Sequence, residues 1–125
     1  MKKLTKQQRD SIKQVLRERF GSLSECRYVD QPIIDTNMIQ AETSNGLVVR
    51  VGQQKISTGT RMSDGTHIDH GVSFMIGNWK AIPSDKRYDT YKKVGYAFYQ
   101  TDGYSKATIN QAIDMFMSDV SKYLG

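Results

Sequence analysis

The sequence predicts an α+β domain: an N-terminal helix, a central antiparallel meander of about four or more strands, and one or two C-terminal helices packed on one face of the sheet. Apolar residues recur at helical spacing near both ends of the chain, which predicts the helices. Turn dipeptides separate alternating, β-rich runs in the middle of the chain, which predicts the sheet.

A helix is expected close to the N-terminus. Thr5 and Gln8 form the capping-box pattern, in which the hydroxyl accepts from an unpaired backbone N–H and the amide side chain reaches back to the cap. Gly21 is a suitable end, because glycine adopts the positive φ that many helix ends require. Four apolar residues fall on one side of this helix: Leu4, Ile12, Val15 and Leu16.

A first hairpin is expected around Asn45 and Gly46. This dipeptide separates residues 37–43 from residues 47–51, and it suits the two positive-φ positions of a type I′ turn. Residues 47–51 alternate in a way that gives the second strand one buried and one solvated face.

A second hairpin is expected around Asp64 and Gly65, between residues 56–62 and 66–76. Two consecutive hairpins favour an antiparallel meander. Pro32 either confines the strand that precedes it to an edge of the sheet or ends that strand, because proline lacks the backbone N–H that a central strand must donate.

The C-terminal residues 105–124 give the clearest helical pattern, with Ser105 as the expected cap. Residues 85–91 predict a helical turn, whereas residues 92–100 fit either a helix or a strand. The apolar stripe of the last helix comprises Ile109, Ala112, Ile113, Phe116, Met117, Val120 and Leu124.

The chain of 125 residues is expected to form one domain, residues 1–125. A chain of this length buries roughly two-thirds of its unfolded surface, so its core needs neither a disulfide nor a metal. A single cysteine, Cys26, forms no internal disulfide, and no apolar stretch approaches the ~20 residues that cross a bilayer. No secretory signal pattern is present. We therefore expect a cytoplasmic protein with no membrane partner.

Positive charge is concentrated at one end of the chain. Lys and Arg total 18 against 13 Asp and Glu, for a net charge of +5. Residues 1–20 hold seven basic and two acidic residues, whereas residues 21–125 hold eleven of each. The excess therefore belongs to the N-terminal segment, residues 1–20, which contains the predicted helix. Four of its cations fall in one strip beside the apolar side: Lys6, Arg9, Lys13 and Arg17.

This row of cations has two interpretations. The plain one is a solvated helix face, because Lys and Arg are the residues that surfaces accept most readily. The functional one is a phosphate contact, because cations spaced along a helix neutralise successive phosphates and release counterions.

Residues 79–104 interleave aromatic rings with cations. Single-stranded nucleic acid uses this combination: a base stacks on a ring while a neighbouring Lys or Arg neutralises its phosphate. In the alternative interpretation the tyrosines fill the sheet face and point their hydroxyls to water. The candidate contacts in this segment are Lys92, Lys93, Tyr96 and Tyr99.

Two short segments resemble the RNA-recognition motif family. Residues 95–99, Gly-Tyr-Ala-Phe-Tyr, are similar to its aromatic core pattern, and residues 74–79 to its other signature strand. The resemblance implies a sheet that exposes Tyr96, Phe98 and Phe74 to stacked bases. The sequence departs from the family pattern in two ways: the residue directly before the glycine is not basic, and the segments lie too close together for the family's intervening helix and strand. We do not assign the chain to that family.

Metal-binding or catalytic side chains crowd together in one place, at His67, Asp69 and His70. On a strand, His67 and Asp69 share a face while His70 points away, so the three do not converge as metal ligands. We therefore interpret them as polar residues near a turn and not as the metal ligands of a metal-dependent hydrolase. The sequence also lacks the glycine-rich loops that cradle phosphates. We therefore expect no catalytic residue, no metal and no cofactor.

The sequence thus favours a small non-catalytic nucleic-acid-binding protein that uses the basic N-terminal helix and the Lys/Tyr-rich segment. The alternative is a small protein-binding or inhibitory accessory module that docks on a larger complex. Both fit the same cations, because an acidic protein surface and a nucleic acid attract a row of Lys and Arg alike.

Overall fold

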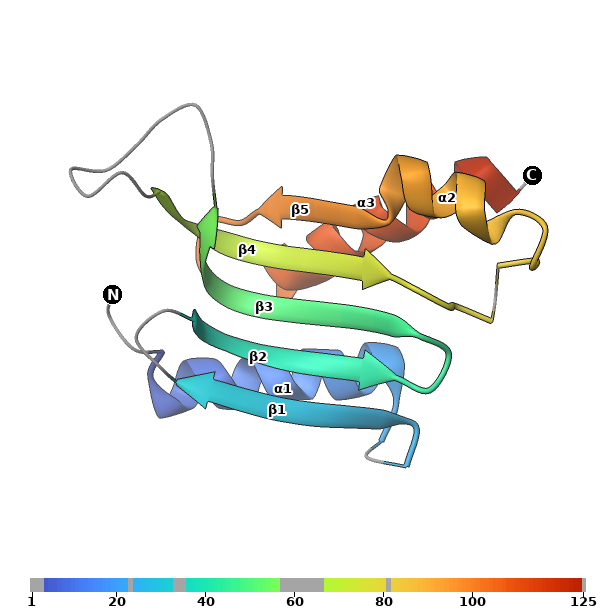
Figure 1. The fold of residues 1–125 in the computed structure, drawn as a ribbon. Helices are drawn as coiled ribbons and strands as arrows, with labels where there is room; N and C mark the ends of the chain where they lie inside the picture. Colours follow the sequence, from blue (N-terminus) through green and yellow to red (C-terminus); the bar gives the residue numbers. More distant parts are fainter. Residues whose placement is uncertain (1–3, 23, 33–35, 57–66, 81, 125) are drawn as a thin grey trace.

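Five strands form one antiparallel sheet in the order β1-β2-β3-β4-β5 (Figure 1). Each strand pairs with the next along the chain, as a meander requires. The computed structural model describes residues 4–22, 24–32, 36–56, 67–80 and 82–124. The strands are β1 (Cys26–Pro32), β2 (Thr36–Thr43), β3 (Leu47–Ile56), β4 (His67–Ile76) and β5 (Tyr96–Gln100).

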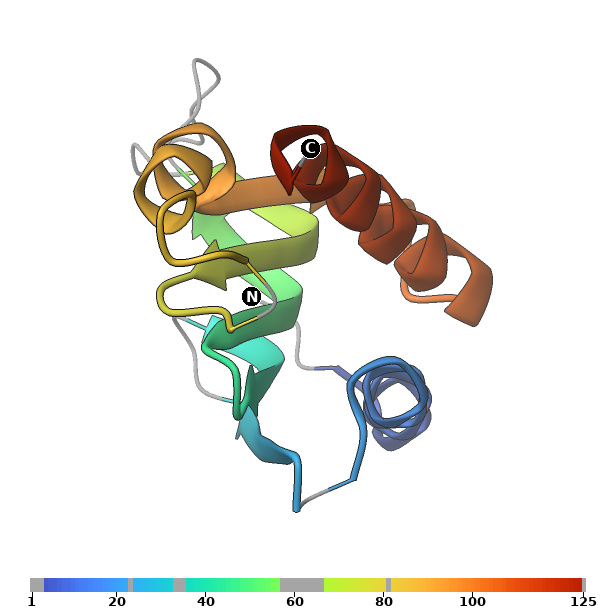
Figure 2. The same cartoon turned by 90° about the vertical axis from the view of Figure 1, so that its right-hand side faces the viewer.

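Helices α1 (Lys6–Phe20) and α3 (Lys106–Leu124) lie on the same side of the sheet (Figure 2). Helix α1 contacts β2, whereas α3 contacts β4 and β5. Helix α2 (Arg87–Val94) lies at the β5 edge, where it contacts α3 and β5. The predicted α+β architecture is confirmed. None of the helices in the described part of the chain is long and apolar enough to cross a bilayer.

The predicted cap of α1 is present in full. The Thr5 side chain accepts from the Gln8 backbone N–H at 3.1 Å, and the Gln8 side chain accepts from the Thr5 N–H at 2.9 Å. Gly21 ends the helix at φ 102°, and its N–H donates to Arg17 O. The predicted apolar side is buried. Local sequence therefore determines both the ends and the rotation of α1.

The first hairpin is confirmed, with Gly46 at φ 91° between β2 and β3. A side chain at this position would also collide with the Asn78 backbone, so glycine is required twice over. The second hairpin differs in its first arm: the partner of β4 is β3, which continues to Ile56. Residues 57–66, which include the predicted Asp-Gly turn, lie outside the described residues. Pro32 ends the edge strand β1, as predicted.

The ambiguous segment before the last helix contains both elements. Helix α2 covers the predicted helical turn, and β5 begins two residues after α2 ends. Ser105 Oγ accepts from the Thr108 N–H at 3.2 Å, which confirms the predicted cap of α3.

An aromatic stack joins α3 to the sheet. The Phe116 ring lies parallel to the Phe74 ring, with centroids 4.0 Å apart and 3° between planes, and Trp79 lies 6.3 Å from Phe116. Phe74 and Phe116 are fully buried. The expectation of a base-stacking Phe74, implied by the family resemblance, is therefore wrong: its ring faces the helices. Met117 also departs from prediction at 38% exposure, because it lies at the margin of the α3 stripe.

Removing the Phe116 ring is expected to destabilise the fold strongly. Phe116→Ala deletes the ring that contacts both Phe74 and Trp79 and leaves a cavity, so the free energy of unfolding should fall by about 3–5 kcal/mol. The neighbouring Met115 is 50% exposed, so Met115→Ala is the matched control and should change it by no more than about 0.5 kcal/mol. Urea denaturation measures the free energy of unfolding of both variants. Equal effects of the two variants would contradict this account of the core.

Candidate nucleic-acid interface

Four cations of α1 lie in one stripe, as the sequence predicts; we call Lys6, Arg9, Lys13 and Arg17 the cation stripe. Their spacing of three and four residues keeps them on one side of the helix. Lys6 and Arg17 are exposed, while Arg9 and Lys13 are half-buried. Burial of the apolar side fixes the rotation of α1, which places the stripe beside that side and leaves Lys6 and Arg17 open to solvent.

Strand β1 holds the end of the stripe that lies nearer the C-terminus of α1. The Arg17 guanidinium lies over the Tyr28 ring, 5.6 Å from its centroid, in a cation–π contact. The Tyr28 hydroxyl donates to Gly21 O and lies 3.4 Å from Leu16 O. Burial raises the pKa of Tyr28, so its hydroxyl stays neutral beside Arg17. The ring thus presents a fixed neutral platform that orients the guanidinium.

Carboxylates border the stripe on one side. A shallow hollow of about 400 Å³ is lined by Asp10, Lys13, Gln14, Arg17 and Glu18. Gln14 Nε2 donates to Glu18 Oε1 at 3.1 Å, which keeps that carboxylate on the Gln14 side of the helix. Both carboxylates lower the positive potential over the hollow. An anion would therefore be attracted along the cations themselves rather than into the hollow.

Another α1 cation, Arg19, has a structural partner. Arg19 Nη2 lies 2.7 Å from Asp114 Oδ1 of α3. This ion pair bridges the two helices that cover the sheet. Arg19 is therefore not counted with the cation stripe.

A second group of candidate residues gathers around α2 and β5. Tyr88, Tyr91 and Tyr96 are 70%, 53% and 58% exposed, and the Lys92 ammonium lies 5.1 Å from the centroid of the Tyr88 ring. We call Tyr88, Tyr91, Lys92 and Tyr96 the tyrosine corner. Lys93 is exposed too, but 100° per residue places it on a different side of α2 from Tyr88 and Tyr91.

The tyrosine corner includes two residues that sequence reasoning did not select as contacts, Tyr88 and Tyr91. Thr90 and Val94 form the buried side of α2, which leaves the two tyrosines on its outer side. A periodicity signal existed, because 88 and 91 are three residues apart. Both lie in the predicted helical turn of residues 85–91, but their exposure became clear only once Thr90 and Val94 were known to face the interior.

Gly95 is the junction between α2 and β5. A Cβ here would lie within 2.4 Å of the Tyr91 ring and within 2.2 Å of the Tyr91 carbonyl oxygen, so only glycine fits. The Tyr91 ring consequently lies directly against the backbone that leads into Tyr96. Glycine at 95 therefore lets the Tyr91 ring pack against the backbone that precedes Tyr96 in the chain.

Tyr96 faces away from α1 and α3, on what we call the outer face of the sheet, which Figure 1 presents to the viewer. Ala97 and Tyr99 pack against the core, so strand alternation turns Tyr96 the other way. Tyr96 ends a row of directly paired residues that crosses all five strands. The row comprises Arg27, Glu42, Val48, Met75 and Tyr96.

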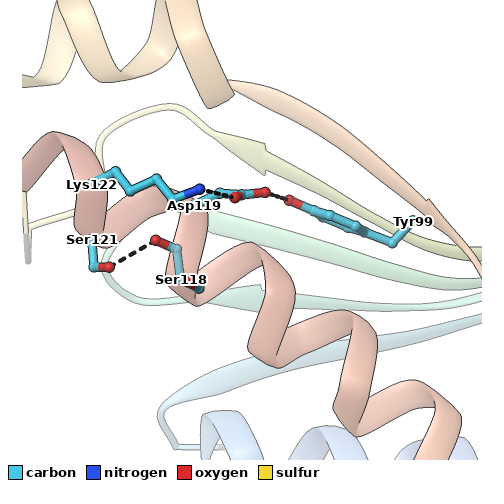
Figure 3. Close-up of polar contacts among 5 residues, drawn as sticks. All are labelled: Tyr99, Ser118, Asp119, Ser121 and Lys122. Carbon is cyan, nitrogen blue, oxygen red and sulfur yellow. Dashed lines mark hydrogen bonds and ion pairs between the residues drawn. The ribbon is translucent and has the colours of Figure 1, made fainter.

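Tyr99, predicted as a contact, faces the helices instead (Figure 3). Its ring meets Phe74 edge-on at 5.8 Å, and its hydroxyl donates to Asp119 Oδ2 at 2.6 Å. Burial and this hydrogen bond raise the pKa of Tyr99, while the same hydrogen bond lowers the pKa of Asp119. Its side chain binds α3 through Asp119, so we do not include Tyr99 in the candidate interface.

The cation stripe and the tyrosine corner lie on different parts of the molecule. Helix α1 lies behind the β1–β2 half of the sheet, whereas α2 lies at the β5 edge (Figures 1 and 2). The structure does not bring together the two groups that the sequence suggested. The cation stripe and the tyrosine corner are therefore two separate candidate surfaces.

A metal centre finds no support in the described part of the chain, where no three His, Cys, Asp or Glu side chains cluster to hold an ion. Strand β4 begins at His67, but the side chains of His67, Asp69 and His70 lie outside the described residues.

Comparison with protein-family models, with curated proteins and with solved structures finds no match for this chain. The fold and the two surfaces are therefore the basis for inferring function.

The Tyr99–Asp119 hydrogen bond has a measurable consequence. Tyr99→Phe removes the main cause of the lowered Asp119 pKa, so that pKa should rise toward its ordinary value of 3.8. Because the folded pKa is the lower one, the stabilisation from Asp119 is present above the ordinary value and is lost as pH falls through the folded pKa. Carboxyl NMR titration should find a smaller increase in Lys122→Gln, since Lys122 is the lesser cause. A larger increase of the Asp119 pKa in Lys122→Gln than in Tyr99→Phe would contradict the assignment of the Tyr99 hydrogen bond as the main cause.

Proposed function

We propose that the chain binds nucleic acid without catalysing a reaction on it, with the cation stripe of α1 as its phosphate contact. The observation that carries the proposal is the arrangement of Lys6, Arg9, Lys13 and Arg17 in one stripe beside the buried side of α1, with Lys6 and Arg17 exposed. A stripe of this kind follows a row of phosphates, and each neutralised phosphate releases a counterion.

The arrangement of the stripe supports this proposal over a merely solvated face. Arg17 is held over the Tyr28 ring, and the Arg9 guanidinium donates to Leu4 O. Cations whose side chains are held in place lose less conformational entropy when they bind an anion. The concentration of the chain's entire charge excess in residues 1–20 supports the same conclusion.

Removing two stripe cations is expected to weaken binding in a salt-dependent way. In Lys6→Gln/Arg17→Gln, the slope of log K against log salt for a DNA duplex should become shallower by roughly 1.8, since each lost phosphate contact contributes about 0.9. Fluorescence anisotropy at several salt concentrations measures this slope.

The matched control removes the same charge from another helix. Lys106 and Lys122 are exposed on α3, so Lys106→Gln/Lys122→Gln should leave the slope close to that of the unmodified chain. Equal slopes in the two double variants would contradict a role for the stripe. A partner that survives nuclease treatment in a pull-down, together with no binding to nucleic acid at micromolar protein, would favour the protein-binding alternative.

A further inference from the structure

We propose that the tyrosine corner binds the bases of an unpaired nucleic-acid strand. This inference rests on the proposed function and deepens it by naming the strand state of the ligand. It involves Tyr88, Tyr91, Lys92 and Tyr96, a surface separate from the cation stripe.

The rings of the corner are exposed, and each is carried by a regular backbone element. Tyr88 lies on α2 and is 70% exposed, and the Lys92 ammonium lies 5.1 Å from the centroid of its ring. Tyr91 lies against the backbone of Gly95, and Tyr96 is fixed in the β5 strand opposite Met75. An aromatic ring that is fixed on one side and open on the other is a platform on which a base stacks with little loss of conformational entropy.

Charge at the corner favours a polyanion over an apolar partner. Burial of the corner in an apolar protein interface would remove the Lys92 ammonium from water without an opposite charge, which is unfavourable. A nucleic-acid strand supplies a phosphate for the ammonium and base faces for the rings together. An acidic protein surface would satisfy Lys92 but would leave three exposed rings without apolar contacts.

An unpaired strand fits the corner better than a duplex. Base faces in a duplex are stacked on each other inside the helix, and only base edges reach the grooves. The three rings offer flat surfaces rather than hydrogen-bond donors, so they require unstacked bases. The cation stripe contacts phosphates and does not discriminate between the two forms.

The test compares three labelled probes of equal length by anisotropy: an oligothymidine strand, a strand of abasic tetrahydrofuran sites, and a DNA duplex. In Tyr88→Ala and in Tyr96→Val, binding to oligothymidine should weaken roughly tenfold per lost stack. Binding to the abasic strand and to the duplex should change less than twofold. The preference for oligothymidine over the abasic strand should therefore fall by the same factor, roughly tenfold, in each variant.

Two kinds of control accompany these variants. Tyr88→Phe and Tyr96→Phe keep the ring and should retain binding within about twofold, since stacking needs the π-face and not the hydroxyl. Met115→Ala/Met117→Ala removes comparably exposed apolar side chains from α3 and should leave all three affinities unchanged. Urea denaturation confirms that each variant is folded.

The outcomes separate the two proposals. If the tyrosine variants bind oligothymidine like the unmodified chain while Lys6→Gln/Arg17→Gln weakens binding, the corner inference is wrong and the proposed function stands. If the unmodified chain binds none of the probes at micromolar protein, both are wrong. An equal loss in the Phe and non-aromatic variants would overturn the stacking mechanism.

Discussion

The structure depends on burying a single apolar face of a five-stranded meander. Strand alternation and the pairing register align Ala41, Val49 and Phe74 in one row across the middle of the sheet. An antiparallel sheet of this kind needs a cover for that face only. Helices α1 and α3 supply the cover, and the Phe74–Phe116 stack secures α3 on the sheet.

This constraint determines which side chains face solvent. Helix α1 must turn its apolar side to the sheet, so the cation stripe lies beside that side, while Arg19 pairs with Asp114 of α3. Helix α2 contributes Thr90 and Val94 to the interior at the β5 edge, which leaves its tyrosines exposed. Core packing therefore determines where the two candidate surfaces lie. It does not determine which residues they contain. Packing alone does not require exposed positions to be tyrosine and lysine rather than any other polar residue.

The elements governed by local rules could be predicted from sequence. The Thr5–Gln8 cap, the Asn-Gly turn before Gly46 and the edge position of the strand ending at Pro32 depend on neighbours a few residues away. The cation stripe could be predicted for the same reason, because helical spacing alone aligns it. Its acidic border and the contact between Arg17 and Tyr28 needed the structure.

Features that depend on distant residues could not be predicted. Tyr99 was expected at the surface, but its partner Asp119 lies 20 residues away on a helix whose position the strand sequence does not specify. The segment around Gly95 fitted a helix or a strand equally, because its second half becomes a strand only by pairing with β4, which lies far away in the sequence. Tyr88 and Tyr91 were not selected because the side of α2 that faces the interior depends on its contacts with α3 and β5.

The central claim is that α1 presents its cations to nucleic-acid phosphates. Backbone amide NMR during titration with an oligothymidine strand tests it most directly, because it locates the contact without any substitution. The account predicts that chemical-shift changes concentrate in residues 6–17 and around the α2–β5 junction, and that added salt reverses the changes in α1 first. Changes confined to α3 or the β1 edge, or none in α1, would contradict it.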